Sequence, residues 1–395
     1  MFYDLASTTW GPEEIDAINR VLAEGRFTMG EHVRQFEVAF AARFGVAHAV
    51  MLNSGSSANL VGVAALFHKK DRPLRRGDEV IVPAISWATT FHPLQQYGLR
   101  LRFLDVDLHT LNMDASQLEA ALTPRTRMVV AVSILGNPAE LDVIRAFCDR
   151  HGLYLFEDNC ESMGASLQGR PCGTFGHVNT FSTFFSHHIS TMEGGLLLTD
   201  DAELDYLARV IRNHGWARDL PGAHDSQTPE GFFEAYRFVM PGYNVRPLEI
   251  CGAVGLEQLK KLDAMIERRR ANAAQFVGLF DGDERFIIQR EHGRSSWFSF
   301  TLILNPHLRI DRAQIMTALR EAGIGFRMIT GGCFPRHEAI RYFDYDTVGA
   351  LTNANLAHDH GFFVGNHPRD LTVEIARLRE VLDRSAVPAR PEAAS

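Results

Sequence analysis

The sequence is poor in lysine and cysteine, and each shortage excludes a class of site. Its four lysines form two adjacent pairs, Lys69-Lys70 and Lys260-Lys261. Its five cysteines are odd in number and stand far apart, with no C-x-x-C pair. This spacing argues against a disulfide framework, a zinc site and an iron–sulfur cluster. We therefore expect no metal and a reducing compartment, as the cytoplasm provides.

Long apolar runs are missing as well. No stretch approaches the roughly 20 apolar residues that a membrane-spanning helix needs. The first residues, Met1 to Leu5, show no cationic start followed by an apolar run, which would mark a secretory signal. The net charge of -8 argues against a nucleic-acid-binding surface. We expect a cytoplasmic protein that binds neither membranes nor nucleic acid.

The chain alternates apolar runs with helical patterns. The apolar runs cover residues 49–52, 79–82, 101–104, 128–132 and 153–156. Runs that are apolar on both faces and separated by helices are typical of a mainly parallel sheet covered on both sides. The predicted fold class is therefore α/β.

Two domains are expected, because 395 residues with 46% hydrophobic residues can bury a large core and a smaller one. We predict a large domain with its N-terminal segment over residues 1–245, and a small domain over residues 246–395. Alternating residues near 286–303 predict an antiparallel sheet with helices in the small domain. Turn-forming composition predicts a mobile loop at 221–229 and a disordered tail from about residue 387.

A glycine turn with several hydroxyls follows the first apolar run. Residues 53–60 read Asn-Ser-Gly-Ser-Ser-Ala-Asn-Leu and lead into a helical pattern. Free backbone N–H groups and hydroxyls at a helix N-terminus can cradle a phosphate, which makes Gly55 and Ser56 candidates. Without other evidence, the same residues also suit an ordinary helix cap.

Two further candidates stand at strand ends. Trp87 follows the run 80–86, where its ring could stack on a cofactor or could simply pack in the core. Asp158 follows the run 153–156, and ligands of open α/β sheets bind beyond the carboxyl ends of the strands. Asp158 could pair with a protonated ring nitrogen, or it could cap the next turn.

Six short motifs carry a family resemblance over nearly the whole chain. They cover residues 28–30, 77–83, 105–107, 157–158, 193–195 and 242–246. With them, the sequence resembles the sugar aminotransferases and dehydratases that use pyridoxal phosphate on the aspartate-aminotransferase (type I) fold. The resemblance implies a mainly parallel seven-stranded sheet in the large domain and a smaller α+β C-terminal domain. It also implies at least a homodimer with shared active sites.

The resemblance assigns the cofactor-binding residues. Seven residues are implied: Gly55, Ser56, Trp87, Asp158, Glu161, Ser182 and Asn244. Gly55, Ser56 and Ser182 would hold the phosphate, Trp87 would stack on the pyridine ring, and Asp158 would bind its nitrogen. Asn244 would reach the phosphate in the site of the partner subunit.

Histidine occupies the place of the family's reactive lysine. That lysine stands six residues before the glutamate of the Glu-Gly-Gly motif, and counting back from Glu193 gives His187. A lysine amine can bond covalently to pyridoxal phosphate, whereas an imidazole cannot. Imidazole can accept and return a proton near neutral pH, so His187 is the predicted catalytic residue. Pyridoxal or pyridoxamine phosphate would then be bound without a covalent bond.

The sequence signals for substrate-binding residues are less specific than those for the cofactor. They are His188, His214, Arg218, Arg246 and Arg327. Arginine suits bidentate contacts with phosphate or carboxylate, so the arginines are candidates for the sugar diphosphate or for glutamate. Each of them could instead be an ordinary solvated side chain.

The histidine favours loss of a sugar hydroxyl over transfer of an amine. By resemblance, the substrate is GDP-4-keto-6-deoxymannose, the products are a 3-deoxy sugar and ammonia, and L-glutamate re-aminates the cofactor to give 2-oxoglutarate. A CDP- or TDP-linked hexose remains an alternative, because no base-reading motif is visible. The cysteine spacing counts against an iron–sulfur dehydrase. A non-catalytic relative that only binds nucleotide sugars is a further alternative.

Overall fold

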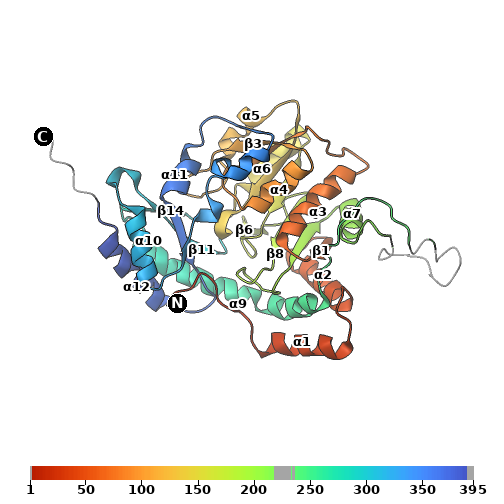
Figure 1. Cartoon of the computed structure of the whole chain (residues 1–395), viewed down its shortest axis with the longest axis horizontal. Helices are drawn as coiled ribbons and strands as arrows, with labels where there is room; N and C mark the ends of the chain where they lie inside the picture. The colour runs from red at the N-terminus through yellow and green to blue at the C-terminus, as the bar shows by residue number, and fades with distance from the viewer. Residues whose placement is uncertain (1, 218–232, 234–235, 389–395) are drawn as a thin grey trace.

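The computed structural model describes residues 2–217, 233 and 236–388. It contains a larger and a smaller sheet joined by a long helix, and a two-stranded ribbon (Figure 1). The predicted loop at 221–229 and the predicted tail beyond residue 388 lie outside the described residues. The larger sheet has eight strands. In order across the sheet they are β1 (His48–Leu52), β9 (Gly195–Thr199), β8 (Val178–Ser182), β5 (Tyr154–Asp158), β4 (Thr126–Val132), β2 (Glu79–Pro83), β3 (Arg100–Leu104) and β13 (Tyr345–Thr347).

The larger sheet is mainly parallel and is buried on both faces, as predicted. Only β9 runs antiparallel to its neighbours among these strands. Successive strand residues face opposite sides, so Val80 and Val82 enter one core while Ile81 enters the other. The helices of the first core are α3 (Gly55–His68), α4 (Ala88–Gln96) and α7 (Ala202–Arg212). Those of the second are α5 (Leu118–Ala121) and α6 (Leu141–His151).

Seven strands of this sheet come from residues 1–245, and the C-terminal part adds an eighth. Strand β13 pairs in parallel with β3. Arg100 lies 3.5 Å from both Asp344 and Asp346, and Arg102 Nη1 lies 3.5 Å from Asp346, so ion pairs hold the added strand. The boundary after residue 245 stays a prediction, and residues well beyond it contribute to the larger sheet.

The smaller sheet is antiparallel, as the alternation near residues 286–303 predicts. Its strands, in order, are β10 (Phe286–Ile288), β11 (Ser299–Leu304), β14 (Gly361–Gly365) and β12 (Phe326–Arg327). Helices α10 (Arg312–Glu321) and α12 (Thr372–Ser385) bury their apolar residues in the same core. The remaining elements are α11 (Thr352–His360) and the two-stranded ribbon of β6 (Ser166–Leu167) and β7 (Arg170–Pro171).

Helix α9 (Glu249–Phe280) joins the two cores and runs along the lower part of the view in Figure 1. Its Leu262 packs with α2 (Glu31–Phe44) under the larger sheet, and its Phe276 packs in the smaller core. The Glu249 carboxylate accepts hydrogen bonds of 2.6 Å from the backbone N–H groups of Gly30 and His32, which ties the start of α9 to the start of α2. Helix α1 (Pro12–Glu24) packs against α9.

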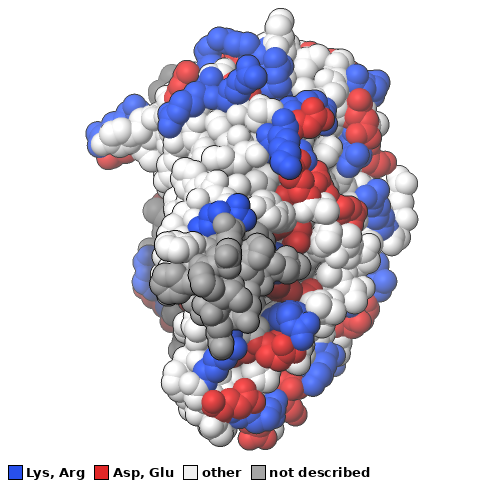
Figure 2. Space-filling view, turned by 90° about the vertical axis from the view of Figure 1, so that its right-hand side faces the viewer, with Lys and Arg blue, Asp and Glu red and all other residues white. Residues whose placement is uncertain are grey.

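The surface carries charges of both signs. On the face shown in Figure 2, lysine and arginine gather along the upper edge and alternate with aspartate and glutamate along the right-hand edge. Among the described residues, no helix combines the length and the apolar character that crossing a membrane requires.

Candidate active site

The start of α3 meets the end of β8, as the phosphate-cradle hypothesis requires. Ser54 caps α3, and its side chain accepts a 3.0 Å hydrogen bond from Ser57 N. A Cβ atom at Gly55 would lie 2.7 Å from Ser182 Cβ and 2.9 Å from Cys160 Sγ. Only glycine permits this approach, which brings Gly55, Ser56 and Ser182 together at the positive end of the helix dipole. We call these three residues the phosphate cradle.

The structure explains why the last residue of the Glu-Gly-Gly motif is glycine. Gly195 begins β9, and a Cβ atom there would lie 2.4 Å from Gly55 N and from Ser54 O. Strand β9 therefore passes directly against the first turn of α3. A side chain at Gly195 would push the phosphate cradle away from the sheet.

Asp158 ends β5 with only 4% of its surface exposed. Its Oδ2 accepts hydrogen bonds from Asn59 Nδ2 at 2.8 Å and from Thr90 Oγ1 at 2.7 Å. Its Oδ1 accepts one from Cys160 N at 3.1 Å and can accept another. These donors fix the carboxylate, so Asp158 can receive a ring N–H from one direction.

Trp87 is exposed, whereas Glu157 is buried. Trp87 stands at the N-cap of α4 with 58% of its surface exposed, which leaves its ring face accessible. Glu157 is buried, and it accepts backbone hydrogen bonds from Gly173 and Phe175 on the other side of the strand. Of the two adjacent carboxylates, Glu157 therefore holds a loop, and Asp158 faces the candidate site.

His187 lies in the segment between β8 and β9. Its backbone N–H donates a 2.9 Å hydrogen bond to Phe184 O, and its ring centroid is 5.3 Å from that of Phe298. Its Nδ1 is buried and makes no hydrogen bond with any described residue. Burial, followed by the charge of Arg269, lowers the pKa of His187 to about 4. The imidazole is therefore neutral at physiological pH.

His188 is fully buried next to His187. It has no exposed surface, and its Nε2 lies 3.3 Å from Ser296 O, so Nε2 carries the hydrogen that it donates to that carbonyl. Burial, followed by the charges of Arg269 and His187, lowers its pKa well below the ordinary value. The ring lies against the segment before β11, and the predicted substrate contact by His188 stays a prediction.

Glu161 links the two sheets. Its Oε2 accepts hydrogen bonds from Leu135 N at 3.0 Å and from Thr330 Oγ1 at 3.3 Å. Leu135 and Thr330 both have positive φ values, 52° and 39°. Burial, followed by the nearby Asp158 charge, raises the pKa of Glu161 to about 7. The carboxyl group is therefore poised to change charge near neutral pH, and its cofactor contact stays a prediction.

The other predicted residues lie on two segments. Asn213 and Asn244 pair in an isolated bridge, so the exposed His214 and Asn244 are neighbours, and Arg246 Nε donates a 3.1 Å hydrogen bond to Asn244 Oδ1. Arg327 is exposed on β12, three residues before the Thr330 that contacts Glu161. Arg218 lies outside the described residues. Substrate contacts by these residues remain predictions.

Comparison with known proteins places this geometry in a family. The sequence profile of the DegT/DnrJ/EryC1/StrS aminotransferase family matches residues 9–380. The chain belongs to this family. A relative in Yersinia pseudotuberculosis, GDP-4-keto-6-deoxy-D-mannose 3-dehydratase, is 49% identical over 386 residues, which cover 97% of this chain and 98% of the relative.

Solved structures of the same kind of dehydratase share the fold. The E. coli enzyme with bound hydrated pyridoxal phosphate (PLP) is 47% identical, with a TM-score of 0.93 over 96% of this chain and 99% of that chain. A second structure of a GDP-4-keto-6-deoxymannose 3-dehydratase contains a trapped PLP–glutamate geminal diamine. It also has 47% identity and a TM-score of 0.93, and it covers 96% of this chain and 100% of that chain.

Several residues of this family site were not indicated by sequence patterns. Asn59 and Thr90 orient Asp158, and Asn59 stands one helical turn after Gly55, a spacing that could have identified it. Arg269 and Phe298 lie behind His187 but come from α9 and the segment before β11. No motif marks these two, because they meet His187 only through the packing of the two sheets.

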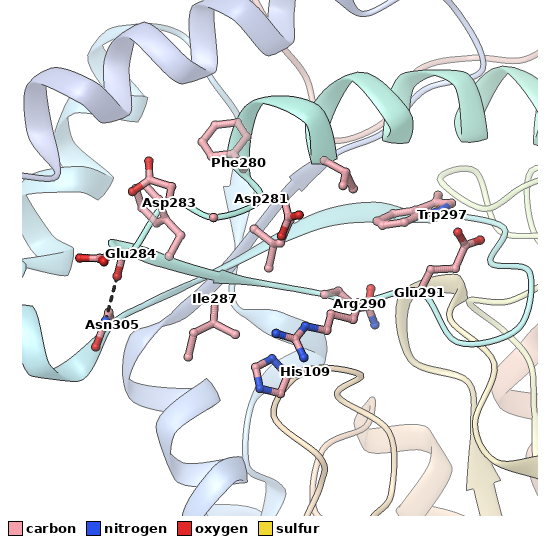
Figure 3. Close-up of a pocket in the computed structure, with 15 residues that line it drawn as sticks. His109, Phe280, Asp281, Asp283, Glu284, Ile287, Arg290, Glu291, Trp297 and Asn305 are labelled. Carbon is pink, nitrogen blue, oxygen red and sulfur yellow. Dashed lines mark hydrogen bonds between the residues drawn. The ribbon is translucent and has the colours of Figure 1, made fainter.

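A separate pocket of about 670 Å³ lies at the end of α9 (Figure 3). It is lined by His109, Phe280, Asp281 and Arg290, among others, and contains none of the predicted site residues. The neighbouring Asp283 is already paired with Arg285 and Arg379. The predicted cofactor site is therefore distinct from this pocket.

Proposed function

We propose that this chain is a PLP-dependent 3-dehydratase acting on GDP-4-keto-6-deoxy-D-mannose. It removes the 3-hydroxyl to give GDP-4-keto-3,6-dideoxymannose and ammonia. L-Glutamate returns the cofactor to pyridoxamine phosphate and leaves as 2-oxoglutarate. The 49% identical relative carries the name of this activity, and two similar structures hold PLP or its glutamate adduct. A role in the synthesis of dideoxysugars such as colitose for lipopolysaccharide O-antigen fits this activity.

The observation that carries the proposal is the position of the four lysines. Lys69 follows the far end of α3 and forms ion pairs with Asp201 and Glu203, and Lys70 is next to it. Lys260 and Lys261 lie on α9, where Lys261 pairs with Glu13 and Glu14. All four lysines are thus away from the phosphate cradle, and His187 stands in the segment where the family's lysine would be.

The residues present fit a cofactor held without a covalent bond. The phosphate cradle supplies helix N–H groups and hydroxyls, Trp87 supplies an exposed ring, and Asp158 supplies an oriented carboxylate. When bound, the cofactor would supply an electron sink that allows the 3-hydroxyl to leave. Without a covalent bond, these contacts alone would keep the cofactor bound.

His187 would hold and move the proton. Its neutral ring can accept a proton, and burial makes the protonated ring a stronger acid than free imidazolium. The proton can then pass to the departing 3-hydroxyl, which leaves as water. A single side chain would serve as base and then as acid.

A homodimer and a cytoplasmic location complete the proposal. Asn244 is exposed at the edge of the site, where it can reach a second copy of the chain. Leu248, 58% exposed, and Phe238, 60% exposed, are apolar side chains on the same stretch of chain that a partner would cover. The five cysteines are free, which suits a reducing compartment.

Incubation with PLP, L-glutamate and GDP-4-keto-6-deoxymannose tests the activity. Ammonia and 2-oxoglutarate should form in equal amounts, and the CDP- and TDP-linked 4-keto-6-deoxyhexoses should react more slowly. Binding of the GDP-sugar without either product would instead indicate a non-catalytic binding protein. A faster reaction with the CDP- or TDP-sugar would overturn the nucleotide assignment alone.

A further inference from the structure

A buried arginine that has no carboxylate partner in the described part of the chain lies behind His187. Arg269, on α9, has 3% of its surface exposed. Its Nη1 donates hydrogen bonds to two backbone carbonyls, Phe298 O at 3.2 Å and Asn366 O. Its Nε makes no hydrogen bond within the described part of the chain. Burial lowers the pKa of Arg269 to about 10, and no charged group of the described residues offsets that effect.

Arg212, the other buried arginine among the described residues, has a different environment. Arg212 is 4% exposed, and its Nη1 lies 2.6 Å from Glu37 Oε1. Burying a charge without a partner costs several kcal/mol, whereas a paired charge recovers much of that cost. The cost of burying Arg212 is offset by its ion pair. The cost of burying Arg269 is not offset in this way, which suggests that Arg269 has a function.

The carbonyls that Arg269 holds belong to the support of the catalytic ring. The Phe298 ring lies 5.3 Å from that of His187 and 5.6 Å from that of His188. Asn366 Nδ2 donates to Trp297 O at 2.8 Å and to Arg269 O at 3.1 Å. We call Arg269, Phe298 and Asn366 the histidine support. It connects α9, the start of β11 and the end of β14 to the two adjacent histidine rings.

We propose that Arg269 is a positioning residue for dehydration, which holds Phe298 against His187 and keeps that imidazole deprotonated between proton transfers. This inference rests on the proposed function. The ring accepts one proton and delivers it to the departing 3-hydroxyl, which leaves as water, so the imidazole ends neutral. A fixed positive charge behind the ring favours the delivery step, because it destabilises the imidazolium.

The groups around His187 agree with this assignment. The charged side chains that act on the adjacent His187 and His188 are Arg269 and Arg270. Arg269 is the charge among them that acts on the pKa of His187, after burial itself. Asp158 and Glu161 are occupied by the hydrogen bonds described above, and Arg270 bonds to Ser295 O and Glu267. Arg269 also contributes to the lowered pKa of His367.

The test is the titration of His187 by NMR in the cofactor-free protein with isotope-labelled histidine, assigned with a His187→Asn variant. In the natural protein, the midpoint should lie near 4. Arg269→Gln keeps a donor for the carbonyls but removes the charge, so the midpoint should rise by about one pH unit or more. Arg269→Lys restores the charge and should restore the midpoint. Arg268→Gln, at the exposed neighbouring position, should leave it unchanged.

Turnover supplies the second readout. Arg269→Gln should lower kcat about tenfold and move the acid limb of the pH profile upward, and Arg269→Lys should recover both. An unchanged His187 midpoint in Arg269→Gln, or no recovery with lysine, would overturn the inference. If Arg269→Gln does not fold, a midpoint of 6.5 or higher in the natural protein would overturn it equally. The titration needs no substrate, so its outcome is separate from the failure of the proposed dehydration.

Discussion

The phosphate cradle and the histidine support are both proposed to serve the dehydration, but they are formed by different parts of the fold. The phosphate cradle joins the first turn of α3 to the end of β8, within one sheet and its covering helix. The histidine support joins α9 to two strands of the smaller sheet. In the proposed mechanism, cofactor retention would depend mainly on the larger sheet, whereas the proton chemistry would depend on how the two sheets pack together.

This difference predicts that mutations should separate binding from turnover. Changes in the phosphate cradle and at Asp158 should weaken cofactor binding first. Changes at His187 and in the histidine support should leave the cofactor bound and reduce the rate. Each of the following experiments tests one side of that separation.

Replacing the catalytic ring should have the largest effect. His187→Ala should lower kcat by about 10²- to 10⁴-fold, because it removes the group that moves the proton. PLP should still bind with near-natural affinity, measured by its absorbance and by equilibrium dialysis. His187→Lys should form a borohydride-reducible adduct with PLP and lose dehydration. Rapid ammonia release by the alanine variant would contradict the assignment.

Removing the charge at Asp158 should affect binding next most strongly. Asp158→Asn loses a charge-assisted hydrogen bond to the ring nitrogen, so PLP affinity should fall about 10- to 100-fold. Turnover should fall with it, and excess PLP should recover only part of the rate. Dialysis followed by measurement of bound PLP checks the result. A variant with full occupancy and a normal rate would refute the role of Asp158.

Filling the glycine of the phosphate cradle should have an intermediate effect. Gly55→Ala places a methyl group 2.7 Å from Ser182 Cβ, so unfolding free energy should fall by about 1–3 kcal/mol, and PLP affinity should fall as well. Gly278→Ala is the matched control, because nothing lies within 4 Å of its added Cβ on α9. The control should be neutral or more stable by up to about 1 kcal/mol. Equal denaturant midpoints for both variants would disprove the close contact.

Neutralising the link between the sheets should have the smallest effect at pH 5, and the effect should grow as the pH rises. The pKa of Glu161 is about 7 in the folded protein against an ordinary value of 4.5, so the folded state binds this proton more tightly. Its contribution to stability is complete below pH 4.5 and is lost as the pH rises through 7. Glu161→Gln should therefore gain stability relative to the natural protein at pH 8, by up to about 3 kcal/mol.

Denaturant unfolding of the cofactor-free protein at pH 5 and pH 8 measures this effect. Glu284→Gln, at an exposed position, should leave the pH dependence unchanged. A difference between Glu161→Gln and the natural protein that is the same at both pH values would show that the carboxyl group does not titrate in this window.

The larger sheet and its strand-end residues could be predicted from the sequence, whereas the histidine support could not. Apolar runs indicate the mainly parallel sheet, and the residues at its strand ends include Asp158 and Trp87. Strand β8 is not an apolar run, because it contains the buried polar residues Asn179 and Thr180. Their side chains are satisfied by Leu198 O at 3.1 Å and Asn59 Oδ1 at 2.6 Å.

The histidine support could not be predicted, since its signal is absent from local sequence. Arg269 stands between Arg268 and Arg270, and three adjacent arginines on a helix read as a solvated face. Only the docking of the smaller sheet buries the middle one. The same docking encloses His188, which adjacency to His187 alone had suggested as a substrate contact. Strand β13 likewise reaches the larger sheet through pairs between distant residues.

The fate of the amine nitrogen tests the central claim most directly. The chain is supplied with ¹⁵N-labelled L-glutamate, PLP and GDP-4-keto-6-deoxymannose, and the products are analysed by mass spectrometry and NMR. Because His187 cannot release an aminated sugar as lysine does, the label should appear as free ammonia beside an unlabelled 3-deoxy sugar nucleotide. Label retained in the sugar nucleotide would contradict the account, since it would show that the chain transfers the amine.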